Sequence, residues 1–137
     1  MTLRAFTDGA SRGNPGAAGV GIIVNDAEGN AVLTLYGFIG VATNNVAEYT
    51  ALVTLLERMK DIPCTKLIIH TDSELMARQM TGRYRVKDQG LKPLHARALR
   101  LMRALPFESR IEHVPREKNR EADRLANRGI DEQVPLH

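Results

Sequence analysis

An alternating run of apolar and polar side chains opens the sequence at Leu3–Asp8, and this is the pattern of a half-buried strand. The following stretch, Gly9–Gly16, is rich in turn-forming residues, so the strand is predicted to end at Asp8 in a glycine-rich loop. A later apolar run, Leu67–Thr71, also leads directly into an aspartate, Asp72. The pattern therefore predicts two carboxylates at the ends of two strands.

The remaining pattern predicts a mixed α/β sheet. Two β-prone runs follow the loop, at Val20–Asn25 and Ala31–Ile39. Apolar residues then recur at helical spacing from Tyr49 to Met59, and this helix is predicted to end near Ile62-Pro63. The second half alternates strands with helices at 66–70, 73–82, 91–105, 109–114 and 119–128, the last helix stopping before Gly129. This alternation implies parallel pairing, so we expect an antiparallel meander of three strands joined to parallel ones, five strands in all.

Composition excludes several classes of protein. The chain has 137 residues, 43% apolar and 26% charged, which fits one globular domain over residues 1–137. Its single cysteine, Cys64, cannot form an internal disulfide, so a cytoplasmic location is expected. No run has the pattern of a signal peptide or approaches membrane-spanning length, and no membrane partner is expected.

The net charge is only +3, but the basic residues are unevenly distributed. One acid, Asp88, stands among seven cations: Arg83, Arg85, Lys87, Lys92, Arg97, Arg100 and Arg103. Such a patch is compatible with nucleic-acid binding. A solvated helix face gives the same pattern, and the charges alone favour that interpretation.

Four acidic residues are candidates for one site. Ligands of open α/β sheets gather beyond the carboxyl ends of the strands, where Asp8 and Asp72 are expected. Glu48 flanks the apolar stripe of its helix, so it either turns inward to a partner or complements the helix dipole at the surface. Asp123 lies among charged helix residues, where a solvated role is the usual one.

Carboxylates that converge repel one another unless a cation joins them. Ligand sets made only of oxygen favour Mg²⁺ or Mn²⁺, and two such ions about 4 Å apart are suited to phosphodiester hydrolysis. The sequence has no Cys/His pattern, so zinc is not expected.

The motifs together resemble those of type 1 ribonuclease H. They are Thr7–Gly16 (TDGASRGNPG), Thr43–Glu48 (TNNVAE), Thr71–Ser73 (TDS), and His113 with Asp123 ten residues later, in the family's order. The resemblance implies the ribonuclease H-like fold, a five-stranded mixed sheet flanked by helices. It also implies endonucleolytic cleavage of the RNA strand of RNA–DNA hybrids by two metal ions, leaving 5′-phosphate and 3′-hydroxyl ends.

The resemblance assigns a role to each matching residue. Asp8, Glu48, Asp72 and Asp123 match carboxylates that hold two Mg²⁺ ions, for which Mn²⁺ can substitute. His113 matches a mobile histidine near the leaving group, and Asn119 a nearby asparagine. Contacts to the hybrid are implied for Asn14, Asn44 and Asn45 at the minor groove, Thr43 at a DNA phosphate and Glu74 at the RNA strand. Amides and hydroxyls recognise the 2′-hydroxyl, but Asn44 and Asn45 are also candidates for helix capping.

Three departures from the family bear on substrate affinity. Glu74 stands where many bacterial members have glutamine, and Val46 where an arginine often follows the paired asparagines. The segment Arg83–Lys92 is shorter than the Trp- and Lys-rich handle of some bacterial members, as in the compact members of the family. We therefore expect binding that fails at a lower salt concentration than in members with the handle.

Two alternative functions remain open at this point. One is a non-catalytic module that binds RNA–DNA hybrids or double-stranded RNA, although such a module has no use for clustered acids facing phosphate. The other is a domain cut from a reverse transcriptase. Because the sequence starts with Met1 and ends soon after the last predicted helix, we expect a complete small protein, and a monomer.

Overall fold

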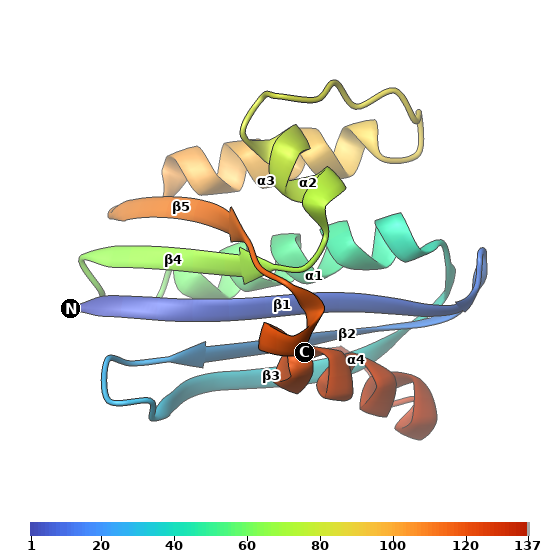
Figure 1. Ribbon diagram of the computed structural model, residues 1–137, viewed down its shortest axis with the longest axis horizontal. Helices are drawn as coiled ribbons and strands as arrows, with labels where there is room; N and C mark the ends of the chain where they lie inside the picture. Colours follow the sequence, from blue (N-terminus) through green and yellow to red (C-terminus); the bar gives the residue numbers. More distant parts are fainter. Residues whose placement is uncertain (137) are drawn as a thin grey trace.

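The computed structural model describes residues 1–136, and its centre is a five-stranded sheet with the strand order β3–β2–β1–β4–β5 (Figure 1). The strands are β1 (Thr2–Gly13), β2 (Gly16–Asn25), β3 (Ala31–Ala42), β4 (Lys66–Thr71) and β5 (Glu108–His113). The β1–β2 and β2–β3 pairs are antiparallel, whereas β1–β4 and β4–β5 are parallel. The predicted mixed sheet, an antiparallel meander joined to two parallel strands, is confirmed.

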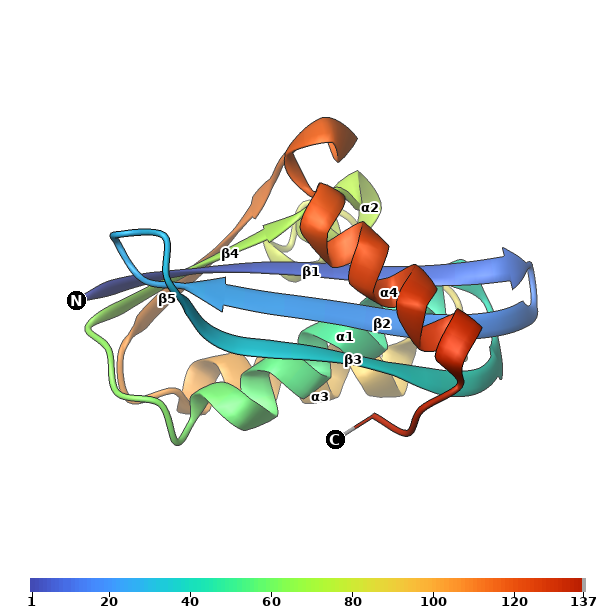
Figure 2. The ribbon, with the colours of Figure 1, turned by 90° about the horizontal axis from the view of Figure 1, so that it is seen from below.

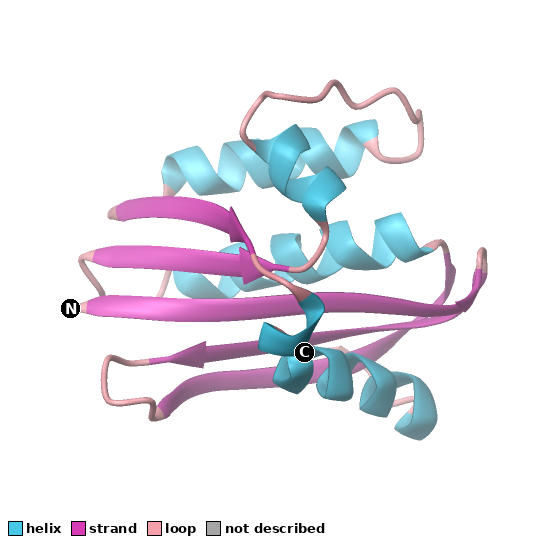
Figure 3. Cartoon of the chain, in the orientation of Figure 1, coloured by secondary structure: helices cyan, strands magenta, loops and turns pink. Residues whose placement is uncertain are grey.

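Helices cover both faces of the sheet. They are α1 (Asn44–Met59), α2 (Glu74–Met80), α3 (Lys92–Ala104) and α4 (Arg120–Glu132), with a short 3₁₀ helix, η1 (Arg116–Lys118), before α4. Figure 2 shows α4 crossing one face of β1, β2 and β3, while α1 and α3 lie on the other face. The connection from α2 to α3 is a long loop that projects from the molecule (Figure 3). No helix within residues 1–136 has the length and apolar character needed to span a membrane.

The main core lies between the sheet and α1. Apolar side chains that alternate along β1 and β4 point to this side, and they meet one face of the helix: Leu3, Ala5, Leu67 and Ile69 from the strands, and Leu52, Leu55, Leu56 and Met59 from α1, all fully buried. Burial of this apolar surface is the dominant favourable contribution to folding. It holds α1 rigidly against β1, which is the strand that carries Asp8.

The first strand is longer than predicted. β1 does not end at Asp8 but continues to Gly13, because residues 9–13 pair with residues 16–20 of β2 in one long hairpin. Gly9 permits close packing rather than a loop: a Cβ on it would lie 2.2 Å from the backbone carbon of Ala47 in α1. Asp8 therefore lies within a strand, directly beneath the start of α1.

Other boundaries differ by a few residues from the prediction. β3 continues to Ala42, three residues beyond the predicted end, because its last residues pair with the start of β2. α1 ends at Met59, before Ile62-Pro63.

The last helix also passes the predicted stop. α4 runs through Gly129 to Glu132 and ends at Gln133, which has a left-handed conformation (φ 50°). Gly129 is a site of close packing, since a Cβ there would lie 2.4 Å from the backbone oxygen of Gly37 in β3. The glycine thus serves the approach of α4 to the sheet and does not end the helix.

We expect Gly129→Ala to lower the free energy of unfolding by about 1–2 kcal/mol, because an overpacking cost of about 2–3 kcal/mol exceeds a gain of about 1 kcal/mol in helix propensity. The new methyl group would push α4 away from β3. Urea denaturation measures the change. Arg120→Ala, at an exposed position of the same helix, is the control and should stay within about 0.5 kcal/mol of the parent chain. A Gly129→Ala chain as stable as the parent would contradict the packing role.

Candidate active site

Three carboxylates converge where β1, β4 and α1 meet. The parallel register pairs Thr7 with Thr71, so the next residues, Asp8 and Asp72, lie side by side. Glu48 reaches them from the second turn of α1. One oxygen from each of the three side chains lies within 4.8 Å of the others. The predicted meeting of Asp8 with Asp72 is therefore confirmed, although only Asp72 follows the end of a strand.

Glu48 faces inward, not the solvent. Its side chain is only 4% exposed, and Oε1 accepts a hydrogen bond of 2.7 Å from the backbone N–H of Gly9. This bond depends on the close contact between Gly9 and α1, which a Cβ would prevent. The interpretation of Glu48 as a surface residue that complements the helix dipole is therefore wrong.

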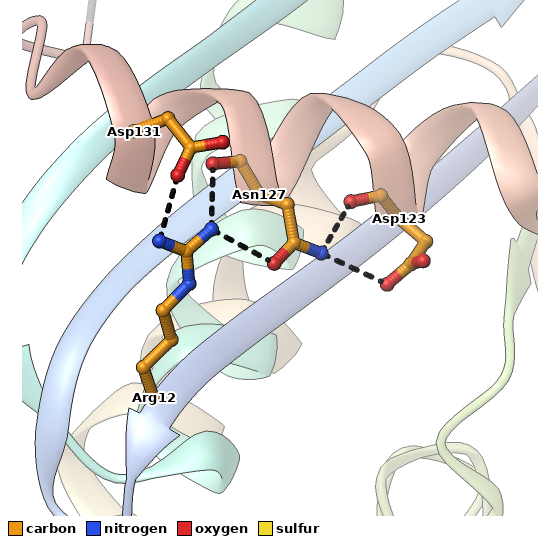
Figure 4. Close-up of polar contacts among 4 residues, drawn as sticks. All are labelled: Arg12, Asp123, Asn127 and Asp131. Carbon is orange, nitrogen blue, oxygen red and sulfur yellow. Dashed lines mark hydrogen bonds and ion pairs between the residues drawn. The ribbon is translucent and has the colours of Figure 1, made fainter.

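Asp123 approaches the cluster from the other face of the sheet. It lies in the first turn of α4 and is half-buried, and both its hydrogen bond and its charge raise the pKa of Asp8. Asn127, one turn further along α4, donates from Nδ2 to the backbone oxygen of Asp123 at 3.0 Å and to Oδ1 at 3.4 Å (Figure 4). The structure thus places all four predicted carboxylates in one region, with Asp123 adjoining Asp8.

Asn119 fixes the orientation of Asp72. It is almost fully buried, and its Nδ2 donates to the backbone oxygen of Thr7 at 2.9 Å and to Asp72 Oδ2 at 3.4 Å. The first of these bonds ties the start of α4 to β1, next to Asp8. Asn119 is therefore placed to hold one carboxylate of the cluster, a contact that the sequence did not predict.

The electrostatics of the cluster favour a bound cation. Burial raises the pKa of Asp8, and the charges of Glu48, Asp72 and Asp123 raise it further. Burial and the charge of Asp72 likewise raise the pKa of Glu48, against smaller opposing effects that include the Gly9 N–H. Within residues 1–136, neither Asp8, Glu48 nor Asp72 forms an ion pair with Lys or Arg. Carboxylates left uncompensated in this way fit a hard divalent ion with oxygen ligands.

The polar residues before α1 form a second group. Thr43 caps the helix, since its Oγ1 accepts from the backbone N–H of Val46 at 3.2 Å. Asn14, in the turn between β1 and β2, accepts through Oδ1 from the backbone N–H of Asn44 at 3.1 Å. Asn44 and Asn45 are exposed and do not supply the cap, so their side chains are free to contact a ligand.

Glu74 and His113 line one groove of about 280 Å³ between α2 and β5. His113 is exposed at the end of β5 and is in register with Thr71, one residue before Asp72. Glu74, in the first turn of α2, forms an ion pair of 3.2 Å with Arg78. Part of the negative charge of Glu74 is therefore offset by its neighbour.

Part of the basic run faces a larger groove of about 460 Å³. Asn45 opens into this groove from α1, and Arg83, Tyr84, Arg85 and Lys87 line it from the α2–α3 loop. Tyr84 is 48% exposed. The other interpretation of the basic run, a solvated helix face, applies only to α3, where Arg97 and Arg100 lie on the exposed side.

Sequence reasoning missed Arg12 and Asn127. Arg12 lies at the far end of β1, contacts Asn127 across 115 positions of the chain and forms an ion pair of 2.7 Å with Asp131 (Figure 4). The available signal was the spacing of Asp123, Asn127 and Asp131, which puts three polar side chains four residues apart on one helix face.

A mixed sheet with buried carboxylates at the junction of β1 and β4 defines the class of protein, an α/β domain with an acidic cluster whose oxygens are close enough to share a metal ion. Residues 6–129 match the family model described as "Reverse transcriptase-like". The chain is 41% identical to ribonuclease HI of Halobacterium salinarum, over 95% of this chain and 65% of that protein. It is 43% identical to the bifunctional protein Rv2228c of Mycobacterium tuberculosis, over 96% of this chain and 36% of that protein.

The crystal structure of LC11-RNase H1 in complex with an RNA/DNA hybrid is also similar, with a TM-score of 0.89 and 39% identity over 95% of this chain and 97% of that one. The chain therefore belongs to the type 1 ribonuclease H family. It spans about two thirds of the length of the Halobacterium relative and about a third of the mycobacterial one.

Proposed function

We propose that the chain cleaves the RNA strand of RNA–DNA hybrids endonucleolytically, with two Mg²⁺ ions, and leaves 5′-phosphate and 3′-hydroxyl ends. The observation that carries the proposal is the convergence of Asp8, Glu48 and Asp72 within 4.8 Å, with Asp123 against Asp8. Relatives named ribonuclease H, and one solved in complex with an RNA/DNA hybrid, support it. A pure binding module gains nothing from buried, mutually repelling carboxylates.

The four carboxylates would hold the two ions, and Mn²⁺ would be accepted by the same oxygen ligands. When bound, such ions activate a water for attack and stabilise the leaving oxygen. The chain's own residues keep the ligands in place: the Gly9 N–H holds Glu48, and Asn119 holds Asp72. His113 stands beside this cluster at the end of β5, where it would supply a proton to the leaving group.

Substrate recognition would rest on the exposed amides near α1. Asn14, Asn44 and Asn45 offer donors and acceptors suited to the 2′-hydroxyls of the RNA strand and to the minor groove. Thr43 would contact a DNA phosphate and Glu74 a 2′-hydroxyl of the RNA strand. Because Glu74 is paired with Arg78, its charge repels nearby phosphates less than an isolated carboxylate would.

A cleavage panel tests the proposal directly. Labelled RNA–DNA hybrid, double-stranded RNA and double-stranded DNA are each incubated with the protein and Mg²⁺ or Mn²⁺, with EDTA as the control. Cleavage of the RNA in the hybrid, dependent on the ion and leaving 3′-hydroxyl ends, is expected. Tight binding of the hybrid without any cleavage would instead identify a binding module, and cleavage of double-stranded RNA would extend the substrate range.

Charge removal in the groove beside Asn45 should weaken hybrid binding without abolishing turnover. Arg83, Arg85 and Lys87 form no ion pair within residues 1–136 and are therefore available for phosphates. Each lost phosphate contact lowers the slope of log K against log salt by about 0.9, so replacing all three with alanine should lower it by about 2–3.

The matched control replaces Lys60, Arg97 and Arg100 with alanine, which removes the same charge from exposed positions outside this groove. Fluorescence anisotropy of a labelled hybrid at several salt concentrations, without divalent ion, measures both slopes. Equal slopes for the two triple variants would show that net charge alone, and not the groove, sets the affinity.

A further inference from the structure

A chain of polar contacts leads from the far end of β1 to Asp123, as Figure 4 shows. Arg12 Nη2 lies 3.4 Å from both the backbone oxygen and Oδ1 of Asn127, while its Nη1 pairs with Asp131. Asn127 then donates to Asp123, and Asp123 contacts Asp8. The contacts therefore connect an exposed arginine with a residue of the candidate site.

Arg12 and Asp123 together fix which end of the Asn127 amide faces each neighbour. A guanidinium has only donors, so the Asn127 oxygen must face Arg12. The amide nitrogen then faces Asp123, where it meets one carboxylate oxygen and the backbone oxygen. Without Arg12, the amide oxygen would lose its donor, and only the contacts of the nitrogen to Asp123 would hold the amide.

Asp123 needs such support more than its neighbours do. Glu48 is held by a backbone N–H at 2.7 Å, and Asp72 by the buried Asn119. Asp123 is only half-buried, and apart from its hydrogen bond with Asp8, Asn127 is the one side chain within residues 1–136 that donates to its carboxylate. The Arg12–Asp131 pair is largely exposed, so it contributes little to stability, and its position beside Asn127 is its distinctive feature.

From these contacts we infer that Arg12 and Asn127 are positioning residues: Arg12 orients the amide of Asn127, and Asn127 holds the Asp123 carboxylate toward Asp8 for a shared divalent ion. The inference deepens the proposed function and rests on it. Groups that orient metal ligands from outside typically change metal affinity or activity 10–100-fold. The 3.4 Å contacts of this chain place the expected effect at the lower end, about 10-fold.

The test compares Arg12→Ala, Asn127→Ala and the double variant with the parent chain. In each single variant, the Mg²⁺ concentration for half-maximal cleavage should rise about 10-fold, while KM for the hybrid stays unchanged. Because Arg12 acts through Asn127, the double variant should lose no more than Asn127→Ala alone. Calorimetric titration with Mn²⁺ should show the same loss of affinity without reference to cleavage.

Arg124→Ala is the matched control, since Arg124 lies on the same helix and pairs with Glu121 at 2.8 Å, away from Asn127. It should leave both measurements unchanged. If the losses of Mg²⁺ affinity in Arg12→Ala and Asn127→Ala multiplied in the double variant, the inference would be overturned. It would also be overturned if the variants bound Mn²⁺ as tightly as the parent chain but had a lower melting temperature. If the parent chain binds Mn²⁺ but cleaves no hybrid, the proposed function fails, whereas the calorimetric comparison still decides the positioning roles.

Discussion

Asp8→Asn is expected to nearly abolish hybrid cleavage, a loss larger than the factor of about 10²–10³ seen when one charge-stabilising group is removed from an active site. Asp8 is the central member of the cluster, since Glu48, Asp72 and Asp123 all raise its pKa. An amide of the same shape cannot supply the charge that a divalent ion requires. Single-turnover cleavage of one hybrid at saturating Mg²⁺ measures the loss.

The same substitution should stabilise the protein in the absence of metal. The folded pKa of Asp8 is raised, so the contribution of this group to stability is largest below its ordinary pKa of 3.8 and is lost as pH rises above it. The amide that replaces the Asp8 carboxylate carries no charge to bury, so the metal-free variant should unfold at a higher temperature than the parent at neutral pH. The difference should shrink as pH falls toward 4.

Addition of a divalent ion should make the parent chain more stable than the Asp8→Asn variant. Mg²⁺ at 100 times its dissociation constant stabilises a folded protein by about 2.7 kcal/mol, and only the parent chain should gain this. Asp61→Asn, an exposed aspartate beyond the end of α1, is the control for both temperature and turnover. Near-normal turnover of purified Asp8→Asn would refute the assignment of Asp8 to the metal site.

The order and type of the main elements could be predicted because their apolar patterns are strong. The apolar residues of Leu67–Thr71 and of α1 follow the patterns of a strand and of a helix. The alternation of strands and helices then requires parallel pairing. The extent of β1 could not be predicted, since Gly9 and Gly13 indicate a turn in any local window. Only the packing of α1 on Gly9 shows that this glycine serves close contact within a paired strand, whereas Gly13 (φ 131°) stands at the turn itself.

The candidate site, like the fold, could be predicted from the sequence only in part. Asp8 and Asp72 follow strand patterns, so their proximity could be anticipated from topology alone. The inward orientation of Glu48 depends on the Gly9 N–H, 39 positions away, and the support of Asp123 depends on Arg12. These contacts join residues 39 and 115 positions apart and leave no local pattern in the sequence, whereas the four-residue spacing of Asp123, Asn127 and Asp131 does.

His113→Ala should reduce kcat substantially while KM changes little. His113 is exposed at the end of β5 and lies in register with Thr71, the residue before Asp72, so it is next to the strand that carries Asp72 without being packed into the core. General acids contribute about 10²–10⁴-fold, and the lower end is expected where metal ions already stabilise the leaving oxygen. Residual activity should therefore remain well above that of Asp8→Asn.

Both variants are measured on the same hybrid at saturating Mg²⁺, with a thermal melt of each to compare folding. Because the His113 side chain is exposed, its loss should leave the melting temperature nearly unchanged, so a lower kcat would reflect chemistry or product release. Full kcat in His113→Ala would assign the histidine a structural role only. Activity as low as that of Asp8→Asn would mean that proton transfer by His113, and not metal binding alone, limits the reaction.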